Sequence, residues 1–159
     1  MIISALKSND SRDSRSPIHI DTISALTSLG VNILFEGNIG LGVYTTDEQY
    51  IEKGLEKASR EDCIKKSDLV ISLQPLDKEE ISLMKPGSTL LGLMNPFSNI
   101  ELLNNCAAQN INLVSMEFIP RITRAQKMDV LSSQANLAGY AAVLEAAQHL
   151  SSALPMMMT

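Results

Sequence analysis

The stretch DLVISLQPLDKEEISLMKPGSTLLGLM, residues 68–94, begins and ends with a short apolar run and holds a polar, acidic segment between them. The two runs are rich in Leu, Ile and Val and have the length of buried strands. Between them, Asp77 and Glu80 have the spacing of a capping box, which starts a helix. Pro86-Gly87 then ends this helix, because proline cannot continue the helical hydrogen-bond pattern. The stretch therefore predicts a strand, a helix and a second strand.

The same alternation of strand and helix patterns extends along the whole chain. Strands are expected over residues 2–6, 31–35, 68–73, 89–94 and 112–115. Helices are expected after Asp21 up to Gly30, over 47–53 behind Thr46, after the Ser59–Asp62 and Asp77–Glu80 capping boxes, over 99–109 and over about 131–154. Such alternation predicts an α/β fold, Rossmann-like or flavodoxin-like, with a parallel sheet covered by helices on both faces and a long C-terminal helix.

The composition is that of one globular domain with its own core. The chain has 159 residues, of which 45% are hydrophobic and 19% charged. Its net charge of −5, scattered basic residues and aromatic content of 4% disfavour nucleic acid as a partner. Apolar runs such as residues 90–94 are far shorter than the roughly 20 residues of a membrane span. The N-terminus has no basic region followed by a long apolar stretch, so no signal peptide is expected.

The cysteines and histidines are isolated from one another along the chain. Cys63 and Cys106 form no C-x-x-C pair, so we expect buried free thiols rather than a disulfide or a metal site. His19 and His149 are expected to be surface or capping residues. No metal ligand set is predicted.

A glycine-rich stretch follows the second expected strand, at residues 37–42. A dinucleotide site would show G-x-G-x-x-G between a strand and a helix. Here Gly37, Gly40 and Gly42 have the spacing G-x-x-G-x-G, and no helical pattern opens at the last of them. We interpret them as turn residues at positive φ, where glycine is favoured, and expect no pyrophosphate cradle.

The most unusual stretch is MEFIPRITRAQKMDVLSSQANLAGY, residues 116–140. Between a strand and a helix it places two arginines, a glutamine and an aspartate within residues 121–129. Guanidinium, amide and carboxylate groups beyond the end of a strand suit recognition of a polar ligand. The residues alone also permit a solvated loop in which Asp129 caps the following helix. Both interpretations stay open at this point.

This stretch resembles the motif P-R-I-S-R-A-Q-x-M-D-x-L-S-S-x-x-N-x-A-G-Y of the N-terminal domains of transhydrogenases and alanine dehydrogenases. Thr123 replaces the serine of the motif and keeps its hydroxyl. Weaker similarity covers nearly the whole chain. The resemblance implies the N-terminal domain of the NAD(H)-binding alpha subunit of a proton-translocating NAD(P) transhydrogenase. It also implies an α/β lobe over residues 1–128 and a long helix over 129–159 that leads toward an absent NAD-binding Rossmann domain.

Departures from the alanine dehydrogenases separate the two branches of this family. Those enzymes use a lysine and a histidine on pyruvate, and the matching positions here hold Leu73 and either Met94 or Asn95. None of these side chains can exchange protons near neutral pH. Arg15 stands where those enzymes bind the carboxylate, although its flanking sequence differs. An alanine-dehydrogenase-like enzyme is therefore the weakest alternative.

The resemblance implies direct hydride transfer between NADH on this subunit and NADP+ on a partner subunit, coupled to proton translocation. Such a transfer needs positioning rather than a side-chain base. By motif position, Arg121, Asp129 and Ser132 would contact the nicotinamide end of NAD(H). Gln126 would reach toward NADP(H) on the partner. Gln126 and Asp129 are thus the candidate catalytic residues.

The implied partners are a Rossmann domain, in the same chain or as a separate polypeptide, the membrane and NADP-binding subunits, and a second copy in a homodimer. The expected location is cytoplasmic, peripheral to the inner membrane through the complex. These 159 residues alone are expected to bind NADH weakly, because the phosphates would bind elsewhere. The alternative function is a non-catalytic dimerisation or interaction module. The last helix is rich in Ala and Gly, which suits either close packing or simple helix propensity.

Overall fold

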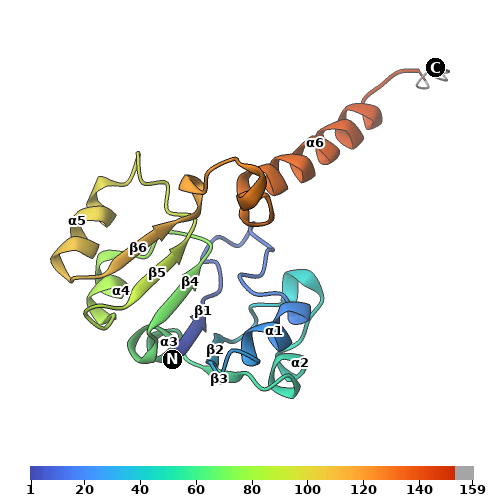
Figure 1. The fold of residues 1–159 in the computed structure, drawn as a ribbon. Helices are drawn as coiled ribbons and strands as arrows, with labels where there is room; N and C mark the ends of the chain where they lie inside the picture. The colour runs from blue at the N-terminus through green and yellow to red at the C-terminus, as the bar shows by residue number, and fades with distance from the viewer. Residues whose placement is uncertain (153–159) are drawn as a thin grey trace. The chain divides into compact units, whose positions relative to one another are not determined.

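The computed structural model describes residues 1–152 and divides the chain into two compact units. The first is Met1–Met116 and contains the whole sheet, and the second begins at Glu117 and contains the last helix (Figure 1). No helix in the described residues is long and apolar enough to cross a membrane.

Six parallel strands form one sheet in the order β3-β2-β1-β4-β5-β6. They are β1 (Ile2–Ala5), β2 (Asn32–Glu36), β3 (Glu56–Ala58), β4 (Leu69–Ser72), β5 (Thr89–Gly92) and β6 (Asn112–Ser115). The strands run outward from β1 in one direction and from β4 in the other, which is the doubly wound arrangement. This confirms the predicted fold class. Five strands lie within two residues of their predicted ranges, whereas β3 was not predicted because Glu56, Lys57 and Ala58 form no apolar run.

Short helices connect the strands. They are α1 (Ile23–Thr27), α2 (Asp47–Glu52), α3 (Arg60–Lys66), α4 (Lys78–Leu83), α5 (Ile100–Ala108) and α6 (Val130–Gln148), with 3-10 turns at Ile20–Thr22, Leu41–Val43, Met116–Phe118 and Thr123–Met128. The prediction of α6 up to residue 154 was too long, because His149 is its C-cap; residues 153 and 154 lie outside the described residues.

Most of the predicted helix starts are confirmed by cap hydrogen bonds. Thr46 and Asp77 each form a complete capping box, while Ser59 accepts only the backbone N–H of Asp62. The assignment of Asp21 as a cap was wrong. A 3-10 turn precedes α1, and the ring of His19 accepts the backbone N–H of Asp21 at 3.4 Å.

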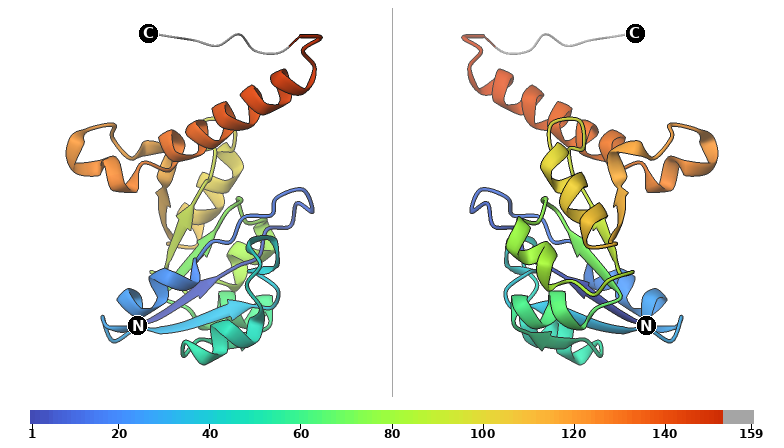
Figure 2. Two further views of the ribbon diagram at one scale, coloured as in Figure 1. Left: turned by 90° about the vertical axis from the view of Figure 1, so that its right-hand side faces the viewer. Right: turned by 90° about the vertical axis from the view of Figure 1, so that its left-hand side faces the viewer.

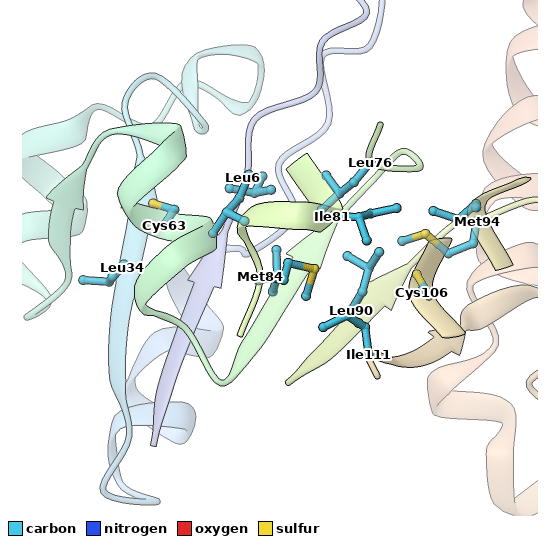
Figure 3. Close-up of a cluster of buried hydrophobic side chains, with 13 residues drawn as sticks. Leu6, Leu34, Cys63, Leu76, Ile81, Met84, Leu90, Met94, Cys106 and Ile111 are labelled. Atoms are coloured by element: carbon cyan, nitrogen blue, oxygen red, sulfur yellow. The ribbon is translucent and has the colours of Figure 1, made fainter. Parts of the chain in front are cut away.

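Helices cover both faces of the sheet. One core cluster joins α3, α4 and α5 to the sheet, and Ile81 of α4 and Leu90 of β5 both belong to it (Figure 3). The other cluster joins α1 and α2 to the opposite face. Along β2, Phe35 belongs to the second cluster and its neighbour Leu34 to the first, because successive side chains of a strand point to opposite faces.

Both cysteines are buried free thiols, as predicted. Burial raises the pKa of the Cys63 thiol to about 12, so that it stays protonated at neutral pH and has no nucleophilic character. Within residues 1–152, no group of three or more metal-ligating side chains is assembled.

The explanation of the glycine-rich turn by positive φ was wrong. None of Gly37, Gly40 and Gly42 has a positive φ; Asn38 (66°) and Tyr44 (57°) occupy the left-handed positions instead. A Cβ atom on Gly42 would lie 2.0 Å from the carbonyl oxygen of Ser14. Glycine is therefore required because two loop backbones touch there, not because of turn conformation.

Candidate functional site

The candidate site is built on the segment between β6 and α6, drawn in orange in Figure 2. A 3-10 helix covers Thr123–Met128, longer than the roughly 3–4 residues usual for such helices. Ala125 of this helix is 4% exposed, and it is the only buried residue among residues 117–152. The neighbouring polar side chains are therefore displayed at the surface around a single anchored residue.

Asp129 closes this segment as the N-cap of α6. Its Oδ1 accepts the backbone N–H of Ser132 at 2.9 Å, and its Oδ2 accepts the Ser132 hydroxyl at 2.6 Å. These hydrogen bonds lower the pKa of Asp129, first through the hydroxyl and then through the backbone N–H, and the charge of Arg121 adds to the effect. The carboxylate is consequently ionised at neutral pH. The capping interpretation of Asp129 is thus confirmed, and it leaves a negative charge at the surface.

The predicted site residues lie together. Arg121, Gln126, Asp129 and Ser132 line one cavity of about 300 Å³, with Ile122 and Thr123 completing the lining. This volume is at the lower end of the range of small-molecule sites. The cavity offers a cationic donor, an anionic acceptor, an amide that both donates and accepts, and two hydroxyls.

Two cavities of the sheet unit contain none of these residues. One, of about 460 Å³, lies between the starts of α4 and α5, and its charged lining is mostly acidic: Asp77, Glu79 and Glu101 against Lys78. Asp77 is already engaged as a helix cap there. A smaller cavity of about 190 Å³ lies beside the loop after β1.

Comparison with known proteins identifies the family. The model of the family described as "Alanine dehydrogenase/PNT, N-terminal domain" matches residues 6–138. The chain belongs to this family. It is 38% identical, over its full length, to the first of the polypeptides that form the NAD(P) transhydrogenase alpha subunit of Rickettsia prowazekii, and it covers 43% of that polypeptide. It is 35% identical to the corresponding polypeptide from Rhodospirillum rubrum, with 92% of this chain and 40% of that protein aligned.

Solved structures agree with this assignment. The transhydrogenase from Sinorhizobium meliloti superposes with a TM-score of 0.91 at 38% identity, covering all of this chain and 48% of that one. An L-alanine dehydrogenase superposes with a TM-score of 0.69 at 18% identity, which shows a shared fold. The resemblance to the transhydrogenase alpha subunit is confirmed, and the chain spans less than half the length of these relatives.

Within this family, the fate of Arg15 distinguishes the chain from an enzyme that binds a small carboxylate substrate at this position. The guanidinium Nε and Nη2 of Arg15 each lie 2.8 Å from an oxygen of Asp13. These hydrogen bonds lower the pKa of Asp13. The chain thus supplies its own carboxylate to this arginine. The short spacing of Asp13 and Arg15 was visible in the sequence, but their pairing was not predicted.

A second feature of this transhydrogenase-like domain could not be predicted from sequence. Arg60 at the start of α3 donates to Glu80 at 2.5 Å, to Glu36 at 2.8 Å and to the carbonyl oxygen of Lys7 at 2.9 Å. These partners are 20 to 53 residues away along the chain. The network ties the loop after β1 to β2 and α4 at the carboxyl ends of the strands, and no local pattern announces it.

Proposed function

We propose that this chain positions the nicotinamide ring of NAD(H) in an NAD(P) transhydrogenase, for hydride transfer between NADH and NADP+ coupled to proton translocation. The observation that carries the proposal is the shared cavity of Arg121, Gln126, Asp129 and Ser132. It occurs in a chain that is 38% identical over its full length to a protein named for this activity. Gln126 and Asp129 are the proposed catalytic residues, in the sense that they touch the reacting cofactors.

The donors and acceptors of the cavity fit a carboxamide ring. A carboxamide has a carbonyl that accepts and an NH2 group that donates, which matches a guanidinium beside a carboxylate. The fixed Asp129–Ser132 pair holds the acceptor in place, and Arg121 lies close enough to influence the charge of Asp129. When bound, the cofactor supplies the hydride chemistry, and these side chains orient it.

The size of the cavity limits what these residues hold. A space of about 300 Å³ suits one ring rather than a whole dinucleotide, and the glycine-rich turn forms no phosphate cradle. We propose that α6 leads toward a Rossmann domain that binds the pyrophosphate and adenosine, in the same or a separate polypeptide. The further proposed partners are the membrane and NADP-binding subunits and a second copy of this chain, on the cytoplasmic side of the inner membrane.

The test is the effect of Gln126→Ala in a complete complex with the Rossmann domain and the other subunits. The amide of Gln126 can donate and accept at once, so it suits a bridge between two nucleotides. We expect stopped-flow hydride transfer to slow by at least about tenfold, or about 1.4 kcal/mol in barrier, with NADH affinity changed less. Unchanged transfer rates would remove this role.

The proposal also sets the affinity of the 159-residue chain on its own. Calorimetry should detect weak or no NADH binding, because the phosphate-binding region is supplied elsewhere. A Kd on the order of a micromolar, about −8 kcal/mol, would contradict the proposed division of the cofactor.

One observation favours a second candidate function, a non-catalytic interaction module. No residue of α6 is buried, and Leu137, Tyr140 and Val143 are more than half exposed. A helix that is apolar on all sides requires packing partners. A module of this kind would retain its assembly, and the complex its full activity, when both Arg121 and Gln126 are replaced by alanine. The transhydrogenase proposal expects that double variant to lose hydride transfer.

A further inference from the structure

The 3-10 helix Thr123–Met128 presents three distinct sides. It has about three residues per turn, so that residues three apart share a side. Thr123 and Gln126 form the side that lines the cavity. Ala125 is buried, whereas Met128, on the same side one turn later, is 56% exposed. The remaining side belongs to Arg124 and Lys127, which do not line the cavity.

Arg124 and Lys127 are exposed cations without an ion-pair partner anywhere in residues 1–152. A rise of roughly 2 Å per residue places their Cα atoms about 6 Å apart. Residues 121–129 contain three cations and one carboxylate, a net charge of +2, whereas the whole chain has a net charge of −5. We call Arg124, Lys127 and Met128 together the basic face.

We propose that the basic face docks against an acidic surface of the protein that carries the second nucleotide. This inference rests on the proposed function, since Gln126 on the adjacent side must approach that nucleotide. Unpaired cations on one edge of a site call for opposite charge on the partner, which aligns the two proteins and speeds their encounter. The exposed Met128 favours a protein surface over a free phosphate, because arginine and methionine are enriched in protein interfaces.

Charge reversal of the pair tests the proposal in the complete complex. The variant Arg124→Glu/Lys127→Glu is compared with Lys53→Glu/Lys78→Glu, which changes the net charge equally at two exposed lysines of the sheet unit that form no ion pair with the described residues. The readout is the Kd for the NADPH-loaded partner subunit by surface plasmon resonance at low and high salt. We expect at least about tenfold weaker binding and a flatter salt dependence for the first variant, and a change below about twofold for the control.

Other outcomes separate this inference from the function on which it rests. An unchanged Kd after charge reversal overturns the basic face, even if Gln126→Ala still slows hydride transfer. Equal losses in the two charge-reversal variants would assign the effect to net charge and overturn it as well. If the isolated chain binds NADPH and the reversal abolishes this, the face holds a nucleotide phosphate and the docking proposal is wrong. If sedimentation shows that the reversal dissolves a dimer of this chain, the occupant is a second copy, which also overturns it.

Discussion

The sheet unit, Met1–Met116, and the segment 117–152 differ in where their apolar side chains find contacts. The sheet unit holds two buried clusters that join five helices to six strands. In the segment, Ala125 alone is buried, and α6, the longest helix among the described residues, has no buried residue. The sheet unit therefore contains the partners of its own hydrophobic residues. The segment displays its residues for contacts that residues 1–152 do not provide.

The largest expected contrast comes from removing one large apolar side chain from each region. Phe35 is fully buried and stacks on Tyr50, with 5.3 Å between ring centroids. Phe35→Ala should lower the free energy of unfolding by about 3–5 kcal/mol, because it leaves a cavity in the core. Leu144→Ala in α6, where Leu144 is 55% exposed, should change it by less than about 0.5 kcal/mol. Urea denaturation followed by circular dichroism measures both, and comparable losses would refute the contrast.

Two glycine substitutions should sharpen the contrast by acting with opposite sign. A Cβ atom on Gly92 of β5 would lie 1.7 Å from the carbonyl oxygen of Ser72, so Gly92→Ala should destabilise the sheet unit by about 1–3 kcal/mol. Nothing lies within 4 Å of the Cβ position of Gly139 in α6. Gly139→Ala should therefore stabilise the helix by about 0.5–1 kcal/mol. A loss of helicity in the second variant would show that α6 is closely packed in solution.

The same difference explains how much could be predicted from the sequence. Strand and helix alternation in the sheet unit was visible because local apolar runs and caps such as Asp77 report on packing within the unit. The edge strand β3 was missed because its residues are mostly exposed. The requirement for glycine at Gly42 could not be inferred either, since it depends on Ser14, which is distant in sequence.

The candidate site was predicted by a different route. Arg121, Gln126, Asp129 and Ser132 were selected by motif position, and the structure places them around one cavity. Local chemistry alone could only pair Asp129 with the start of α6, because capping spans three residues. Ligand contacts depend on a molecule that no periodicity reports, so that the roles of the four residues remain predictions.

The smallest expected effect on folding separates the two tasks of Asp129. Asparagine caps helices as well as aspartate does, whereas alanine does not. Asp129→Asn should therefore leave amide hydrogen exchange at the start of α6 unchanged, while Asp129→Ala should accelerate it. If the charge of Asp129 serves the ring, both variants should weaken NADH binding by the complete complex to a similar degree.

The pH dependence of the unmodified complex gives an independent check on this separation. Hydrogen bonds from Ser132 lower the pKa of Asp129, so the carboxylate is fully ionised above its ordinary pKa of about 3.9 and is protonated only as pH falls through the lowered value. Its contribution to NADH affinity should thus be constant between about pH 6 and 8 and should disappear only in acid. Asp129→Asn should reproduce that acid state at neutral pH. If Asp129→Asn binds NADH normally and only Asp129→Ala fails, the residue acts through the helix it caps, and the segment resembles the sheet unit in having a purely structural use for its polar groups.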